Sequence, residues 1–198
     1  MNSQRVVFGV VGAGMALCGV LAAAPVAVAG EHEVTAARDS GLPSYEQWQA
    51  DVRKVMDPAI PYLNDRVAQG GKKLAIVLDI DNTSLETEYH RGAPNKPVLA
   101  FAKAAADKGV SVLVATARKE SGRSGALAEL KKAGYPAITE ICLKKDESHA
   151  VDVKIRCRKE FVSEGYTLIA NVGNRPGDLE YKNYERGFKL PDYDGQLS

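Results

Sequence analysis

The sequence has almost no excess charge of either sign. Its 26 Lys and Arg residues nearly balance its 25 Asp and Glu residues, which gives a formal net charge of +1 at pH 7. Proteins that bind nucleic acid or an anionic membrane surface electrostatically usually carry a marked positive excess. The composition therefore contains no nucleic-acid-binding signal, and the 45% of apolar residues is ordinary for a globular protein.

Cysteine is also scarce. The chain has three cysteines, and none forms a CxxC pair or lies beside a pair of histidines, which argues against a zinc site. Cys142 and Cys157 are compatible with one disulfide in an exported chain, or with two buried free thiols. The sequence alone leaves both alternatives open, because a disulfide needs the two Cβ atoms to meet.

Charge is nearly absent from the N-terminal region. Among residues 1–30 the one charged side chain is Arg5, and the apolar run behind it ends in the small-x-small pattern Ala27-Val28-Ala29. This arrangement predicts a Sec-type signal peptide over residues 1–29, cut after Ala29. The protein is then expected to be secreted, without a stable membrane anchor after cleavage. An uncleaved anchor helix is the alternative, because the run approaches spanning length.

The rest of the chain divides into a linker and one domain. Residues 30–43 show no clear hydrophobic period and are expected to be a linker. A helical pattern begins at Ser44, which can cap the helix, and Pro58 and Pro61 should break or restart it. Residues 44–198 are predicted to form one domain that starts with this N-terminal helical segment. They contain no internal repeats and no low-complexity stretches, and nothing in them specifies an oligomeric state.

Beyond that segment, apolar strands alternate with amphipathic helices that end in glycine. Strands are expected at 73–80, 110–116, 137–143 and 166–173, and helices at 96–109, 121–134 and 149–165. A short Tyr-rich tail follows. Continuous apolar strands in a strand-helix alternation predict an α/β fold, with a doubly wound parallel sheet and helices on both faces. The crossovers should be right-handed.

Polar side chains gather where three of these strands end. They are Asp79 and Asp81 after the first strand, Thr116 and Arg118 after the second, and Asn174 and Asp178 after the last. In open parallel sheets, ligands bind beyond the carboxyl ends of the strands. We therefore expect these side chains to converge on one crevice.

The first pair, Asp79 and Asp81, carries the strongest chemical signal. One carboxylate can attack an electrophile while the other handles protons. Two carboxylates so close repel each other unless a cation lies between them, and a hard divalent cation with oxygen ligands, Mg²⁺ above all, meets this need. The alternative is a loop of solvated or helix-capping aspartates.

Four stretches together resemble the haloacid dehalogenase superfamily. LDIDNT resembles its first motif DxDx[TV], VLVATAR its second, Lys154 its third-motif lysine, and NVGNRPGDL its fourth, GDxxxD. The run KxxxRxxxxxxGY before GNRPGDL and the ending GFKLP are similar to the secreted acid phosphatases of subfamily IIIB, with class B bacterial and plant vegetative-storage relatives. The resemblance covers residues 44–198. It implies a Rossmann-like haloacid dehalogenase core.

The resemblance implies roles for individual residues. Asp79 would be the nucleophile that forms an aspartyl-phosphate, and Asp81 would protonate the leaving alkoxide and then activate water. The phosphoryl group would be bound by Thr116, Ala117, Arg118 and Lys154. For Arg118 two possibilities stay open: contact with substrate, or pairing with a carboxylate across the crevice. Arg158 shares a helix face with Lys154 and would anchor the fourth-motif loop.

The resemblance also implies a Mg²⁺ site, and the chain departs from the family pattern there. Mg²⁺ would be held by Asp79, by the backbone carbonyl of Asp81 and by the fourth motif. Asn174 stands where the family commonly has an aspartate. Its amide oxygen can still ligate a hard cation without bringing charge, so either Asp178 supplies the carboxylate or the metal binds more weakly through Asn174.

The spacing of the motifs leaves no room for an inserted cap domain. About a dozen residues separate Thr83 from the helix at Pro97, and one helix fills the gap after Thr116. A minimal cap predicts an open site that accepts varied small-molecule phosphomonoesters. The expected function is a secreted Mg²⁺-dependent acid phosphatase. The alternatives are a phosphotransferase that passes the phosphoryl group to an alcohol, and a weak or silent phosphate-ester-binding or storage-type relative.

Overall fold

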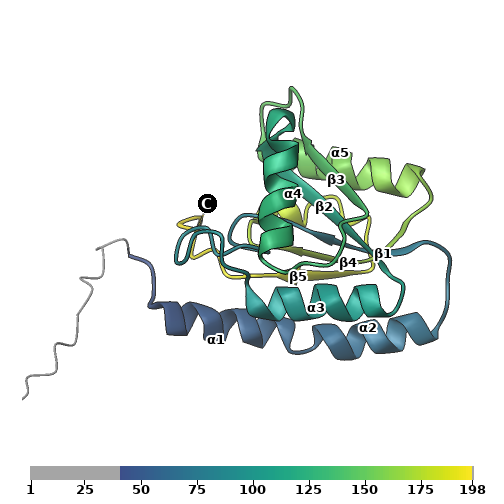
Figure 1. Cartoon of the computed structure of the whole chain (residues 1–198), viewed down its shortest axis with the longest axis horizontal. Helices are drawn as coiled ribbons and strands as arrows, with labels where there is room; N and C mark the ends of the chain where they lie inside the picture. The colour runs from purple at the N-terminus through teal and green to yellow at the C-terminus, as the bar shows by residue number, and fades with distance from the viewer. Residues whose placement is uncertain (1–40, 198) are drawn as a thin grey trace, which may run out of the picture. The chain divides into compact units, whose positions relative to one another are not determined.

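Within residues 41–197, which the computed structural model describes, five strands form one parallel sheet in the order β3-β2-β1-β4-β5 (Figure 1). Each neighbouring pair is parallel. The strands are β1 (Leu74–Leu78), β2 (Ser111–Lys119), β3 (Glu140–Lys144), β4 (Thr167–Gly173) and β5 (Arg186–Lys189). The predicted parallel α/β sheet is confirmed.

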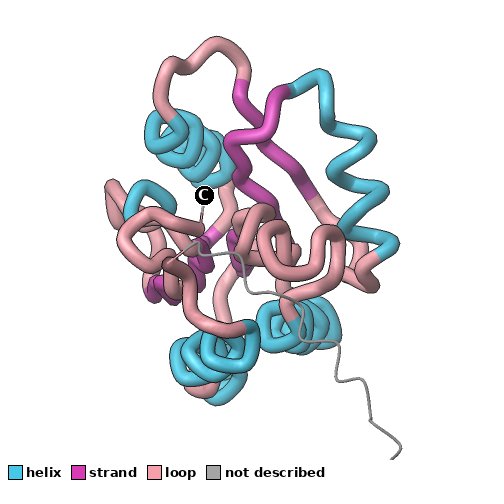
Figure 2. The backbone as a smooth tube through the Cα atoms, turned by 90° about the vertical axis from the view of Figure 1, so that its left-hand side faces the viewer, coloured by secondary structure: helices cyan, strands magenta, loops and turns pink. Residues whose placement is uncertain are grey.

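Helices cover both faces of the sheet. They are α1 (Tyr45–Met56), α2 (Ala59–Ala68), α3 (Lys96–Asp107), α4 (Arg123–Lys132) and α5 (Ala150–Ser163), with 3₁₀ turns η1 (Glu120–Gly122) and η2 (Pro176–Asp178). Figures 1 and 2 show α5 on the opposite side of the sheet from α1, α2 and α3. The predicted doubly wound arrangement is therefore observed.

The alternation of side chains along β1 produces two cores. Ile76 and Leu78 point into the larger core, which includes residues of α1, α2, α3 and α4. Ala75 and Val77 point to the other face and pack with residues of α5. Because successive side chains of a strand face opposite ways, a buried parallel strand must be apolar at every position. This requirement explains why the LAIVL sequence of β1 shows no polar alternation.

The N-terminal helices begin and break where the sequence indicates. Ser44 caps α1, with its Oγ accepting a hydrogen bond from the backbone N–H of Gln47 at 3.2 Å. The chain breaks between α1 and α2 at Asp57 and Pro58, whereas Pro61 lies inside the first turn of α2. A proline is tolerated there because the first N–H groups of a helix have no intrahelical partner.

Two strand expectations need correction. Residues 186–189, expected within the Tyr-rich tail, form the edge strand β5 beside β4. The second strand does not stop at Thr116 but continues to Lys119, with its pairing to β3 shifted between Ala115 and Lys119. Thr116 and Arg118 thus lie in the irregular last part of β2 rather than beyond it.

A disulfide joins the edge strand β3 to α5. Cys142 and Cys157 are bonded, with their Cα atoms 5.5 Å apart, so the first of the two alternatives for these cysteines holds. The bond fixes α5 against the sheet one turn after Lys154.

The predicted signal peptide and nearly all of the predicted linker lie outside the described residues, so secretion stays a prediction. None of the helices within residues 41–197 has the length and apolar character needed to cross a membrane.

The strand order creates a crevice between β1 and β4. The chain leaves β1 toward β2 and β3, then returns through α5 to β4 on the other side of β1. The loops after neighbouring strands therefore diverge at this point, which is where ligands bind in open α/β sheets. Residues 79–95 follow β1 as a loop with two isolated bridges, and no separate cap domain stands over the crevice within the described part of the chain.

Candidate active site

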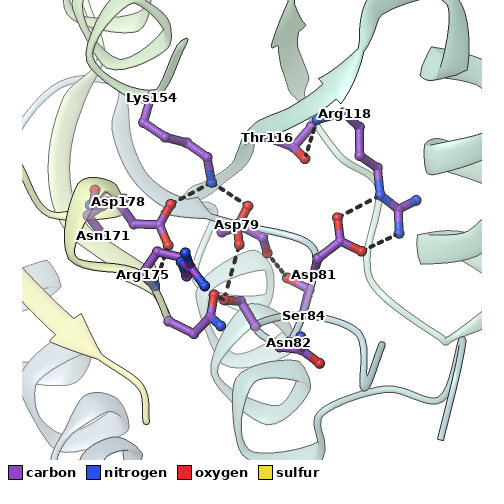
Figure 3. A network of polar contacts seen from close by, with 12 residues as sticks. Asp79, Asp81, Asn82, Ser84, Thr116, Arg118, Lys154, Asn171, Arg175 and Asp178 are labelled. Carbon is purple, nitrogen blue, oxygen red and sulfur yellow. Dashed lines mark hydrogen bonds and ion pairs between the residues drawn. The ribbon is translucent and has the colours of Figure 1, made fainter. Parts of the chain in front are cut away.

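Asp79, Lys154 and Asp178 form a buried charged cluster at this crevice. The Nζ of Lys154 donates to Oδ1 of Asp79 and lies 2.6 Å from Oδ1 of Asp178 (Figure 3). The three residues are exposed by 7% or less. A single ammonium group thus lies between two buried carboxylates that come from the ends of two neighbouring strands.

Burial and the neighbouring opposite charge shift the pKa values of Asp79 and Lys154 in opposite directions. Burial raises the pKa of Asp79; the ammonium group of Lys154 opposes this shift, and the carboxylate of Asp178 adds to it. Burial alone would lower the pKa of Lys154, but the two carboxylates outweigh it and the pKa is raised. Lys154 therefore stays cationic, because neutral lysine would leave two buried negative charges without a partner.

Asp81 faces a different cation. Arg118 donates from Nε to Oδ2 of Asp81 at 2.9 Å and from Nη2 to Oδ1 at 2.8 Å, and Thr87 donates to Oδ1 at 2.9 Å. Burial would raise the pKa of Asp81, but the hydrogen bonds and charge of Arg118 lower it. Figure 3 shows the Asp81 side chain turned toward Arg118 and away from Lys154. The pairing of Arg118 with a carboxylate is therefore observed, and its contact with substrate stays a prediction.

Three of the four predicted substrate-binding residues, Thr116, Ala117 and Lys154, line one cavity of about 410 Å³. Thr116 is buried, and its Oγ1 accepts a hydrogen bond from the backbone N–H of Arg118 at 3.2 Å. The cavity is lined by Asp79, Asp81, Thr116, Ala117, Ala150, Val151, Lys154, Asn174, Arg175, Pro176, Gly177 and Asp178. It therefore contains every predicted site residue except Arg118, which lines a neighbouring hollow on the other side of Asp81.

The loop after β1 contributes two contacts that the sequence analysis did not assign. The Oγ1 of Thr83 lies 3.3 Å from Oδ2 of Asp79 and 3.3 Å from Oδ1 of Asn174. Ser84 donates its hydroxyl hydrogen to the backbone carbonyl of Asp79 at 2.6 Å. Thr83 is the last residue of the DxDx[TV] pattern, which was the available signal for it. Together these hydroxyls hold the turn that presents Asp79.

Asp178 is held by the backbone as well as by Lys154. Its Oδ2 accepts from the N–H of Arg175 at 2.9 Å, and its carbonyl accepts from Asn171 at 2.7 Å and from Nη1 of Arg158 at 2.6 Å. The predicted anchoring of this loop by Arg158 is confirmed.

Gly173 permits the close approach of the loop to β4. A Cβ atom at this position would lie 2.3 Å from Cβ of Asp178, so only glycine leaves room for the Asp178 side chain.

The donor set of the crevice fits a hard divalent cation. Within residues 41–197, no three His, Cys, Asp or Glu side chains gather closely enough to hold a metal by themselves. The carboxylate of Asp79 and the amide oxygen of Asn174 nevertheless meet around one hydroxyl, that of Thr83, with Asp178 beside them. These side-chain donors are oxygens, the ligand type that Mg²⁺ prefers. The identity of the metal stays a prediction.

Two solved structures share the fold of this chain. The structure is similar to the class C acid phosphatase from Bacillus anthracis, with a TM-score of 0.63 and 18% identity over 76% of this chain and 80% of that chain. The same phosphatase with tungstate bound matches with a TM-score of 0.60 at the same identity and coverage. At this identity the two likenesses establish a shared fold. No curated protein matches the sequence.

The sequence itself identifies the family. The family model of the HAD superfamily, subfamily IIIB (acid phosphatase), matches residues 25–95 and 88–196, which is most of the chain. The resemblance found in the four motifs is thereby confirmed, and a phosphomonoester hydrolase is the enzyme class that the family supports. The chain belongs to subfamily IIIB, the acid phosphatases, of the haloacid dehalogenase superfamily.

Proposed function

We propose that this chain is a secreted, Mg²⁺-dependent acid phosphatase that hydrolyses phosphomonoesters through an aspartyl-phosphate on Asp79. The observation that carries the proposal is the placement of Asp79: a buried carboxylate at the carboxyl end of β1, held by Lys154 at the wall of an accessible cavity. A carboxylate beside a fixed ammonium group can attack phosphorus while the negative charges around it are partly neutralised.

In the first step a carboxylate oxygen of Asp79 forms a bond to phosphorus, and the bond from phosphorus to the leaving oxygen breaks. Lys154 offsets the charge shared by Asp79 and the phosphoryl oxygens. Thr116 is suited to bind one of those oxygens, because a hydroxyl whose Oγ1 accepts from the N–H of Arg118 can still donate its own hydrogen. Ala117 lines the same wall.

Asp81 is assigned to the proton transfers. It gives a proton to the leaving alkoxide, and in the second step it takes a proton from the water that attacks the phosphorus of the aspartyl-phosphate. Its bidentate pair with Arg118 restrains the carboxylate on the far side of the cavity. The Asp81 side chain must therefore leave Arg118 and take a proton from solvent before it can give one to the leaving oxygen.

A divalent cation would supply further charge stabilisation to the transferring phosphoryl group. Asp79, the carbonyl of Asp81, Asn174 and Asp178 are the residues that would hold it. The absence of an inserted cap within residues 41–197 supports an open site and a broad range of phosphomonoesters. Secretion is supported by the leader pattern of residues 1–29.

The test is hydrolysis of 4-nitrophenyl phosphate by the chain starting at Gly30, from about pH 4 to 9, with Mg²⁺ or with EDTA. Turnover should require both the metal and Asp79, so Asp79→Asn should be inactive. Asp65→Asn is a matched control, because Asp65 is exposed on α2 and is not among the residues that line the cavity. Full activity in EDTA or in Asp79→Asn would refute the proposal.

A further inference from the structure

The last described residues, 190–197, lie against the loop that follows β4. We call them the C-terminal strap. The N–H of Leu190 donates to the carbonyl of Gly173 at 2.9 Å, which continues the pairing of β5 with β4. Further along, the carbonyl of Leu197 accepts a hydrogen bond from Nδ2 of Asn174 at 2.8 Å. The mechanism described above assigns no role to this contact.

The contact determines which end of the Asn174 amide faces the active site. A backbone carbonyl can only accept a hydrogen bond, so the amide group must turn its nitrogen toward Leu197. Its oxygen then faces the opposite way, toward the hydroxyl of Thr83 at 3.3 Å and the side of Asp79. Thr83 alone does not decide the orientation, because a hydroxyl can donate or accept. Leu197 is therefore the group that selects it.

The strap is held in place by groups other than Asn174. Nη1 of Arg175 donates to the carbonyl of Gly195 at 2.9 Å and lies 3.3 Å from the carbonyl of Leu197. The hydroxyl of Tyr193 donates to Asp51 on α1 at 2.9 Å. The Leu197 side chain is fully buried in the larger core. The carbonyl that meets Asn174 is thus fixed by packing and by hydrogen bonds, independently of any metal.

The same contact distinguishes asparagine from aspartate at this position. Asn174 is 1% exposed, and its two ends have different partners: a carbonyl on one side and a cluster of oxygens on the other. An aspartate would place a second acceptor against the Leu197 carbonyl, where the two oxygens repel and the carbonyl keeps only the longer hydrogen bond from Nη1 of Arg175 at 3.3 Å. Asparagine is the residue that can donate to the strap and offer an oxygen to a cation at the same time.

We propose that the C-terminal strap is a positioning element of the metal site: the Leu197 carbonyl holds the Asn174 amide so that Oδ1 is presented to the cation. The inference rests on the proposed metal-dependent function. It also accounts for a neutral ligand in this loop, since the orientation of the amide replaces part of what a charged ligand would contribute. Groups that orient a metal ligand typically change metal affinity by about 10- to 100-fold when removed.

The experiment compares Mg²⁺ affinity, measured by isothermal titration calorimetry, in chains that start at Gly30. One variant ends at Gln196 and lacks the Leu197 carbonyl and side chain. Its control is Leu197→Ala, which loses the buried side chain but keeps the carbonyl. We expect the truncation to weaken Mg²⁺ binding about 10-fold or more, and Leu197→Ala to keep the affinity within about 3-fold while its melting temperature falls. Equal affinities in the two variants would overturn the inference.

A third variant keeps the test decisive if the truncated chain does not fold. In the chain that starts at Gly30 and keeps Leu197 and Ser198, Asn174→Asp adds a charged ligand but loses the strap contact. This variant should bind Mg²⁺ no more tightly than the parent and should melt at a lower temperature. Markedly tighter binding would contradict the inference. In the truncated chain, where the strap contact is already lost, Asn174→Asp should strengthen Mg²⁺ binding. The parent, the two single changes and their combination form a double-mutant cycle, and purely additive effects on affinity in it would also contradict the inference.

The two proposals fail in different ways. If the parent chain binds no Mg²⁺, the metal-dependent function fails and the strap inference fails with it. If the parent binds Mg²⁺ and either the truncation or Asn174→Asp gives the contrary result, the strap inference alone is rejected and the phosphatase proposal stands.

Discussion

The ammonium group of Lys154 lies between the carboxylates of Asp79 and Asp178, 2.6 Å from Oδ1 of the latter. The two aspartates are 99 positions apart in sequence, and each follows one of the two strands that border the crevice. Lys154 comes from α5, the helix that connects β3 to β4. The site is therefore assembled by the doubly wound topology, and the charge of one lysine makes that assembly stable.

Lys154→Met should abolish turnover and destabilise the protein. Without the ammonium group, two buried carboxylates face each other unpaired, and removing one partner of a buried ion pair typically costs about 3–5 kcal/mol. Urea unfolding at neutral pH in EDTA measures the loss. Lys131→Met, at an exposed position of α4, is the matched control and should change the free energy of unfolding by less than about 0.5 kcal/mol. A wild-type free energy in Lys154→Met would contradict the cluster as described.

Asp81→Asn should separate the two chemical steps. A nitrophenolate leaves without a proton, whereas an alkoxide needs one, so the first step should survive with 4-nitrophenyl phosphate and fail with an alkyl phosphate. The second step should slow by about 10²- to 10⁴-fold with either substrate, because water loses its base. Stopped-flow kinetics should thus reveal a burst of nitrophenol followed by slow turnover. Equal slowing of the burst and the steady state with the aryl ester would argue against this role for Asp81.

Gly173→Ala should damage the loop after β4. The added Cβ would lie 2.3 Å from Cβ of Asp178, so the loop must move, and with it the partner of Lys154. We expect a loss of more than about 2 kcal/mol in unfolding free energy and weaker Mg²⁺ binding, both measured on the chain starting at Gly30. Gly125→Ala provides the contrast: it lies within α4 with nothing within 4 Å of the new Cβ. That variant should be neutral or more stable by about 0.5–1 kcal/mol.

The sequence predicted the elements that local signals specify. β1 is a continuous apolar run, β4 is apolar apart from Thr167 and Asn171, and each predicted helix of the α/β region ends close to a glycine. Composition and the helix-ending glycines are therefore enough to locate these elements. The edge strand β5 was missed because only Phe188 and a partly buried Lys189 stand out from an exposed sequence, and its pairing with β4 is a long-range contact. Such a short strand forms because β4 provides backbone hydrogen-bonding partners along its free side.

The residues of the candidate site could be predicted from the sequence, but several of the contacts between them could not. The rule that polar residues meet at the carboxyl ends of parallel strands brings Asp79, Thr116 and Asp178 to one cavity, as observed. The partner of Asp81 stayed open because side-chain direction at an irregular strand end is not encoded locally. The contact of Asn174 with Leu197 is likewise set by where the chain returns after β5, and no motif marks it.

The most direct test of the account is to trap the covalent intermediate on Asp79. The chain starting at Gly30 would be mixed with Mg²⁺ and 4-nitrophenyl phosphate, quenched, and treated with borohydride, which reduces an acyl phosphate of aspartate to homoserine. Peptide mass spectrometry would then locate the converted residue, with Asp65→Asn and Asp79→Asn chains in parallel. The account predicts homoserine at position 79 in the parent and in Asp65→Asn, and none in Asp79→Asn. Substrate turnover without conversion at Asp79, or conversion at another aspartate, would contradict it.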